Sequence, residues 1–248
     1  MKKIFLYSFM LGMIVLGFTS CNDDNDELTD SRLTYYVNLE LQGDEMMLVP
    51  IGTKFTDPGC KATLAGEDYT SNVLVEGASD VNPNQVGFYD INYSAVNKDG
   101  FSASVSRTVV VYDPSVTTSI AGTYSTDMGA SLYGTNKLTF ADRAANYGNT
   151  SQCEGIKFTE YVPGIFYCND LLGGWYDQIR AYGSSYAMTG YVSLNPDNTI
   201  TLLSSYIKGW GDGLDYIENG VYDPETGKIS YSLSYAGQIF MDIVLNKN

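Results

Sequence analysis

The segment GFYDINYSAVNKDGFSASVSRTVVVY (residues 87–112) decides the fold of the N-terminal half of the chain. Apolar and polar residues alternate along 87–96 and again along 101–112, which is the period of a β-strand with one buried face. Between the two runs stands NKDG (97–100), an Asn/Asp/Gly sequence of the kind that closes a tight turn. The segment therefore predicts an antiparallel hairpin.

The same alternation continues upstream of this hairpin. The stretch LTYYVNLEL (33–41) places every second residue on one apolar face, namely Leu33, Tyr35, Val37, Leu39 and Leu41. Further on, Pro58-Gly59, Gly66 and Gly77 separate shorter strands. Several short strands with regular turns predict a β-sandwich over residues 33–113, followed by a linker at 114–119.

This region resembles the bacterial surface Ig-like domain. The matching features are Asp57-Pro58-Gly59, the Gly87-Phe88-Tyr89 opening of the strand centred on Tyr93, and Val109-Val110-Val111. The resemblance covers roughly residues 33–113 and implies an Ig-like β-sandwich that acts as a rigid spacer. The family often carries an Asp and a Gly-Asn around its last hairpin, where this chain has Asn97 and Gly100-Phe101, so no cation is expected there.

Residues 120–248 also predict antiparallel strands. One hairpin surrounds Asn195-Pro196-Asp197-Asn198, another turns at residues 223–227, and IFMDIVLN (239–246) closes the domain. No helical period stands out in the chain behind its N-terminal signal. About eight or nine strands in this length predict a β-barrel or a compact sandwich, so the fold class is all-β.

The N-terminus predicts a lipoprotein signal. Lys2 and Lys3 precede an apolar run that is too short for a membrane-spanning helix. Phe18-Thr19-Ser20-Cys21 resembles a bacterial lipoprotein processing box, which implies cleavage after residue 20 and attachment of acyl chains, such as palmitate, at Cys21. Two or more chains anchor a protein almost permanently. The other interpretation is an ordinary secretory signal that happens to contain a cysteine.

Behind Cys21 lies an acidic tether, residues 21–32, which holds Asp23, Asp24, Asp26, Glu27 and Asp30. Such a run is solvated and repels itself, as expected of a spacer between lipid and fold. It also resembles the acid-rich tag that sends Bacteroidetes lipoproteins to the outer face of the outer membrane. The two interpretations are compatible.

Composition removes several classes of function. The formal net charge is −15, which argues against binding to nucleic acid. The chain has no histidine, so Ser-His-Asp and Cys-His catalysis and the usual zinc sites are excluded. We expect no cofactor and no bound metal, since GDGLD and NPDNT supply too few oxygens for Ca²⁺.

The remaining cysteines allow one disulfide. Cys153 and Cys168 flank two strands around a Pro-Gly turn and could pair across that hairpin in an oxidising envelope. Alternatively, both are small core residues. Under the disulfide hypothesis Cys60 is an unpaired buried thiol.

Two Gly-rich stretches, residues 169–183 and 206–220, carry both tryptophans of the chain. Exposed rings stack on the apolar faces of sugars, and nearby carboxylates bind sugar hydroxyls. The candidate ligand-binding residues are Trp175, Tyr176, Tyr182, Trp210 and Asp212. Alternatively, the tryptophans plug the end of the barrel. A carboxylate-only glycosidase would need a facing pair from Asp170, Asp177, Asp212, Asp215 and Glu218.

These features predict a binding protein rather than an enzyme. The C-terminal segment resembles domains of Bacteroidetes lipoproteins found near outer-membrane glycan import systems, often beside this Ig-like module. The resemblance implies an accessory glycan-binding lipoprotein of a polysaccharide uptake system, with an outer-membrane transporter complex as partner. The alternative is a structural or adhesive surface protein with a protein partner and no saccharide ligand.

Overall fold

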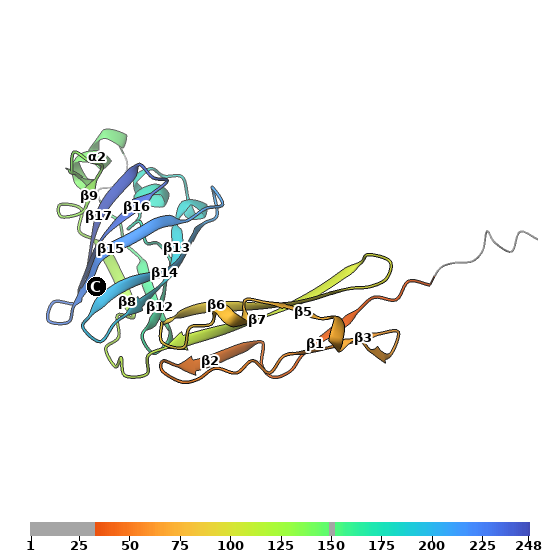
Figure 1. Cartoon of the computed structure of the whole chain (residues 1–248). Helices are drawn as coiled ribbons and strands as arrows, with labels where there is room; N and C mark the ends of the chain where they lie inside the picture. The colour runs from red at the N-terminus through yellow and green to blue at the C-terminus, as the bar shows by residue number, and fades with distance from the viewer. Residues whose placement is uncertain (1–32, 149–151) are drawn as a thin grey trace, which may run out of the picture.

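A computed structural model describes residues 33–148 and 152–248 as two β-rich bodies (Figure 1). The expected signal peptide (1–20) and the whole acidic tether (21–32), including Cys21, lie outside the described residues. No helix within the described ranges is both long and apolar enough to cross a membrane.

The N-terminal body is a sandwich of two sheets. The first sheet has the order β1-β3-β4, with β1 at Asn38–Leu41, β3 at Cys60–Leu64 and β4 at Glu67–Asp68. The second sheet has the order β2-β7-β6-β5, with β2 at Met46–Pro50, β5 at Leu74–Glu76, β6 at Gly87–Val96 and β7 at Ser102–Tyr112. Short 3₁₀ turns stand at Thr70–Asn72 (η2) and Ala78–Asp80 (η3).

The predicted hairpin is confirmed as β6 and β7, which pair in register from Gly87↔Val111 to Val96↔Ser102. Its inward residues, among them Ile91 and Val109, pack with Cys60 of the facing sheet. The expected strand at 33–41 is shorter than predicted, because only residues 38–41 pair with a neighbouring strand.

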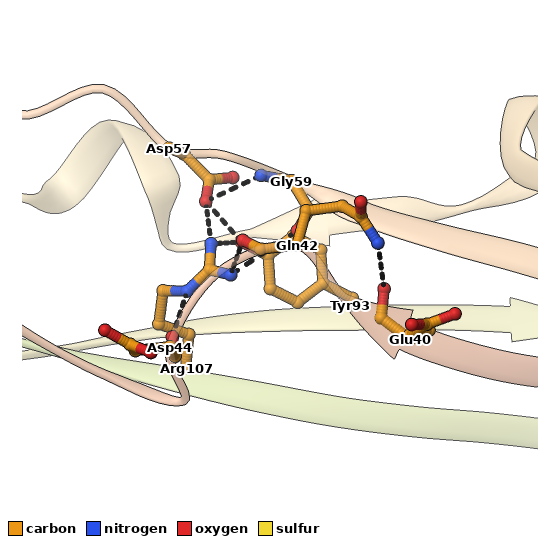
Figure 2. Close-up of polar contacts among 7 residues, drawn as sticks. All are labelled: Glu40, Gln42, Asp44, Asp57, Gly59, Tyr93 and Arg107. Carbon is orange, nitrogen blue, oxygen red and sulfur yellow. Dashed lines mark hydrogen bonds and ion pairs between the residues drawn. The ribbon is translucent and has the colours of Figure 1, made fainter.

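A buried arginine ties the loops of this sandwich together (Figure 2). Arg107, on β7, is fully buried and forms an ion pair with Asp57. Its guanidinium also donates to the backbone oxygens of Asp44 (2.9 Å) and Gln42 (2.5 Å). The Tyr93 hydroxyl donates to Asp57 at 2.5 Å. The Asp57 motif thus connects two loops to the central hairpin.

The C-terminal body contains a closed antiparallel barrel of eight strands. In barrel order they are β8 (Gly122–Thr126), β11 (Ile156–Val162), β12 (Ile165–Cys168), β13 (Met188–Leu194), β14 (Thr199–Ile207), β15 (Leu214–Asp223), β16 (Lys228–Tyr235) and β17 (Ile239–Lys247). The seam closes where β17 pairs with β8, as in Leu245↔Thr126. The choice between barrel and sandwich is therefore settled in favour of the barrel.

The expectation that the mature chain lacks a helix is wrong. Helix α2 (Phe140–Tyr147) stands between β10 (Leu138–Thr139) and β11, and a short strand β9 (Leu132–Tyr133) pairs with both β10 and β17. Thr139 caps the helix by accepting from the Asp142 backbone N–H at 3.0 Å, and Gly148 ends it in a left-handed conformation. Two turns are too short to show a clear helical period.

The two ends of the barrel differ. The turns β11–β12, β13–β14 and β15–β16 are short and lie at one end, the proximal end, which faces the sandwich. The connections that carry α2, η4 (Trp175–Ile179, a π-helical turn), η5 (Ser184–Tyr186) and residues 208–213 lie at the other, the distal end. Figure 1 shows α2 at the end of the barrel remote from the sandwich.

Aromatic side chains join the two bodies. Phe88 of β6 lies with its ring centroid 4.9 Å from that of Tyr191 and 5.7 Å from that of Tyr161, both in the barrel. The Tyr161 hydroxyl lies 3.0 Å from the Met46 sulfur. Val116, in the expected linker, is buried in the barrel core. The bodies are therefore in direct contact.

Candidate functional site

Three aromatic side chains line an open hollow of about 400 Å³ at the distal end of the barrel. They are Tyr182, Tyr186 and Trp210, and we call this site the aromatic hollow. Trp210 and Tyr182 are each 43% exposed, so both present ring surface to solvent. Exposed aromatic surface of this kind is suited to stacking on a flat apolar ligand face.

Two connections bring these rings together. Tyr182 and Tyr186 come from the β12–β13 connection, and Trp210 comes from the β14–β15 connection. The backbone N–H of Gly209 donates to the Ser185 oxygen at 2.7 Å. A Cβ at Gly209 would lie only 2.4 Å from the Tyr186 ring, so glycine lets the two connections close on each other.

The Trp210 ring packs against two buried rings and one partly buried ring. Its centroid lies 4.7 Å from that of the buried Tyr176 and 4.9 Å from that of the partly buried Tyr186, both close to edge-on, and 5.9 Å from that of the buried Tyr235 in a stacked arrangement. Because its neighbours fix the orientation, the exposed part of Trp210 needs little further ordering on binding.

Polar groups surround the aromatic hollow. Asp212 accepts a hydrogen bond from the Tyr235 hydroxyl at 2.9 Å. Burial, and then this bond to Asp212, raise the pKa of Tyr235, which keeps its hydroxyl a donor. Arg180 donates to the Tyr182 hydroxyl at 2.6 Å and lies over the Tyr147 ring at 4.3 Å. The site therefore combines flat rings with one exposed carboxylate.

The structure corrects the predicted set at two positions. Trp175 is 0% exposed and stacks on Tyr133 at 4.2 Å, inside the distal end of the barrel. It is a core residue, as the alternative interpretation had it. Tyr176 is also buried and supports Trp210 rather than facing solvent. Tyr182, Trp210 and Asp212 do lie together at the surface.

A pair of carboxyl groups, Asp170 and Asp177, lies on the same β12–β13 connection as Tyr182 and Tyr186, and we call it the acid pair. Asp170 is buried and accepts from the backbone N–H groups of Leu172 (2.9 Å), Gly174 (2.8 Å) and Met188 (3.1 Å). Burial, followed by the charge of Asp177, raises the pKa of Asp170 to about 8. Burial also raises the pKa of Asp177. The acid pair thus holds the start of the connection that carries η4.

The other carboxylates considered for glycoside hydrolysis do not share this location. Asp215 accepts from the Ser234 hydroxyl (2.8 Å) and the Gly237 backbone (2.7 Å). Glu218 lines a separate hollow of about 340 Å³, with Tyr216 and Asp242, on the outer wall of the barrel. Within residues 33–148 and 152–248, no group of three or more Cys, Asp or Glu side chains is placed to hold a metal ion.

The predicted disulfide is wrong. Cys60, Cys153 and Cys168 are all free and buried. The Pro-Gly hairpin itself is confirmed, but its register sets Cys168 opposite Phe158, whereas Cys153 precedes β11 and its sulfur lies 3.8 Å from the Gly174 oxygen. Burial raises the pKa of Cys153 to about 12 and raises that of Cys168 as well, so both thiols stay protonated.

Sequence reasoning missed Tyr186, Tyr235 and Arg180. Tyr235 ends a strand with an alternating pattern, which indicated only a core residue. Tyr186 stands next to the Gly-rich stretch that was singled out, and its position three residues after Gly183 was the available signal.

Two family models match the chain. Residues 39–111 match the Ig-like domain of bacterial surface proteins, and residues 113–247 match a model described as a C-terminal domain. Seven chains of solved structures match, among them the lipoprotein BT2262 from Bacteroides thetaiotaomicron. That protein is 40% identical, and the match covers 86% of this chain and 100% of that one with a TM-score of 0.45. A search of curated proteins found no match.

An Ig-like surface domain followed by this barrel defines a class of two-domain bacterial surface lipoproteins. The chain belongs to the family of the Bacteroides lipoprotein BT2262. As a lipoprotein with a bacterial surface domain, it is anchored to a membrane at the cell surface.

Proposed function

We propose that this lipoprotein binds glycans at the aromatic hollow and serves as an accessory protein of a polysaccharide uptake system. The observation that carries the proposal is the open hollow lined by Tyr182, Tyr186 and Trp210 at the distal end of the barrel. Its rings would stack on the apolar face of a sugar, and the exposed Asp212 carboxylate would accept from sugar hydroxyls. Binding per site would be modest, about micromolar to millimolar, since a solvated sugar gives up water.

The position of the aromatic hollow supports this function. The Ig-like domain contacts the proximal end of the barrel through Phe88, so the hollow points away from it. In this proposal Cys21 carries the lipid in the outer membrane, the Ig-like domain acts as spacer, and the hollow faces the cell exterior. An outer-membrane transporter complex is the partner that would receive the glycan.

We propose binding without catalysis. Asp170 already accepts from three backbone N–H groups, and Asp215 from a hydroxyl and a backbone N–H. Asp212, two residues after Trp210, is an exposed carboxylate, and a glycosidase of either stereochemical type needs two facing carboxyl groups.

The test is Trp210→Ala. Because the ring is 43% exposed, we expect a melting temperature close to that of the unaltered protein but a loss of roughly 1–3 kcal/mol in glycan binding. Tyr216→Ala is the matched control, since Tyr216 is 42% exposed in the same domain but lies outside the aromatic hollow. Calorimetric titration with soluble α-glucans, β-glucans, xylan and mannan measures both variants.

Equal binding by Trp210→Ala and the parent would contradict the proposed site. If no glycan binds the parent, and Trp210→Ala instead loses adhesion to a cell-surface protein, the structural or adhesive function takes its place.

A further inference from the structure

The end of the Ig-like domain remote from the barrel carries exposed apolar side chains. Leu33 is 69% exposed, Tyr36 65% and Phe101 49%, and Tyr35 and Val96 are exposed as well. The alternating pattern at 33–41 would bury Leu33 and Tyr35, so their exposure leaves apolar surface without an intramolecular partner. We call Tyr35, Tyr36, Val96 and Phe101 the tip patch. Clustered exposed apolar residues mark interaction surfaces.

The tip patch is ordered by contacts within the domain. The Asn97 side chain is buried and donates to the Tyr35 backbone oxygen at 2.7 Å, while its own oxygen accepts from the Phe101 N–H at 2.8 Å. The rings of Tyr36 and Phe101 lie 5.4 Å apart. One buried amide therefore holds the start of the domain against the tip of the β6–β7 hairpin.

The location of the tip patch indicates what covers it. Figure 1 shows the tip of the β6–β7 hairpin at the end of the domain away from the barrel, which is also where the described chain begins. Leu33 follows Cys21 by only twelve residues, which span at most about 40 Å when fully extended. A lipid on Cys21 would therefore keep this end of the domain within reach of the bilayer.

We propose that the tip patch rests on the lipid surface, with its tyrosine and phenylalanine rings in the interfacial layer. Tyr has an apolar body and a polar hydroxyl, which suits the boundary between acyl chains and headgroups. Lys98 and Asp99 at the hairpin tip carry opposite charges, so attraction comes from the apolar groups and resists salt. Tethering raises the local concentration of the patch, so weak intrinsic affinity is sufficient.

The lipid contact would fix the tilt of the Ig-like domain, and of the barrel in contact with it, relative to the membrane. A domain held by a tether alone can lie in any orientation, whereas one that also contacts the membrane through its tip stands on it. The aromatic hollow would then be held at the far end of the molecule. This inference rests on the lipid anchor at Cys21 in the proposed function, but not on glycan binding.

The test uses the full lipidated chain in phosphatidylcholine vesicles whose acyl chains are brominated. Both natural tryptophans lie in the barrel, so Phe101→Trp adds a reporter at the tip, read after subtracting the emission of the parent. Leu48→Trp is the matched control, because Leu48 is 51% exposed in the same domain but lies on β2, which reaches the barrel contact at Met46.

We expect brominated lipid to lower the added Phe101→Trp emission about twofold at both low and high salt, with no change for Leu48→Trp. Equal quenching of the two, or none for Phe101→Trp, would overturn the inference. A blue-shifted Phe101→Trp emission without quenching would also overturn it, because another protein copy would then cover the tip. Flotation of each variant with the vesicles first separates failure of the anchor from failure of the tip contact.

Discussion

The two carboxyl groups of the acid pair, Asp170 and Asp177, carry less charge at neutral pH than two free carboxylates would. Asp170 is buried with three backbone N–H groups around it, and Asp177 is the neighbouring charge that adds to the effect of burial on the pKa of Asp170. Two adjacent carboxylates in a buried place repel each other, so one proton remains shared at neutral pH. Ionisation of the second group would disturb the connection that supports Tyr176.

Stability should therefore fall as the pH rises from about 4 to about 8. In the unfolded chain both carboxyl groups lose their protons near pH 4, whereas the folded pKa of Asp170 is raised to about 8. The folded state binds more protons across this window, so its free energy of unfolding falls with pH, by up to about 1.4 kcal/mol per pH unit for one proton. Urea unfolding at several pH values measures this slope.

Asp177→Asn should make that slope shallower, because it removes the Asp177 charge that adds to burial in raising the pKa of Asp170. Glu225→Gln, at an exposed position in the β15–β16 turn of the same body, is a control that removes the same charge. If Asp177→Asn and Glu225→Gln show the same pH dependence, the acid pair does not share a proton.

At the scale of single residues, only part of the candidate site was predictable from the sequence. It placed both tryptophans in one candidate site, but the two Gly-rich stretches look alike and differ in burial: Trp175 fills the barrel and Trp210 lines its rim. Burial depends on contacts far away in sequence, such as Tyr133 against Trp175. The predicted disulfide between Cys153 and Cys168 was wrong for the same kind of reason, since the spacing of two cysteines in the sequence does not reveal the register of the strands between them.

Among the structural elements, the β6–β7 hairpin of the Ig-like domain depends on one buried ion pair. Arg107 is fully buried and its guanidinium reaches Asp57 and the loop oxygens of Gln42 and Asp44 (Figure 2). Removal of one partner leaves an uncompensated charge, which lowers the free energy of unfolding by about 3–5 kcal/mol.

Arg107→Met should accordingly unfold the Ig-like domain at lower denaturant than the barrel. Since both tryptophans lie in the barrel, their fluorescence should keep its unfolding midpoint while circular dichroism gains an earlier transition. Lys54→Met removes an exposed positive charge from the same domain and should leave both probes unchanged. If the fluorescence and circular dichroism transitions of Arg107→Met coincide and match those of the parent, the ion pair contributes little to the stability of the Ig-like domain.

Elements with a strong alternating pattern were predictable. The hairpins β6–β7, β11–β12, β13–β14 and β15–β16 all form where alternation and turn residues predicted them. Helix α2 was missed because two turns give no clear period, although Thr139 and Asp142 form a recognisable cap at its start. Closure of the barrel was also unpredictable, because the β17–β8 pairing links residues more than a hundred positions apart.

On the scale of the whole molecule, the contact between the two bodies sets how far the aromatic hollow can swing. Phe88 packs against Tyr161 and Tyr191, and Val116 is already part of the barrel core, which leaves few free residues between the bodies. The Ig-like domain and the barrel are therefore connected by a stiff joint rather than by a flexible linker.

Phe88→Ser should loosen that joint, because it removes the ring that fills the contact. Small-angle scattering should then show a broader distribution of distances, while the melting temperature of each body changes little. Phe101→Ser, at the opposite end of the Ig-like domain, should leave the scattering unchanged. An unaltered scattering curve for Phe88→Ser would mean that the joint is held by other contacts.

The seam between β17 and β8 has a consequence for the order in which the molecule is made. Strand β8 emerges from the ribosome among the first of the barrel, yet its closing partner β17 is synthesised last. Until then β8 presents an open edge, which invites pairing with another chain. Each new molecule thus passes through a stage in which its barrel is an unclosed sheet, and at that stage the β8 edge is the part of the barrel most exposed to intermolecular pairing.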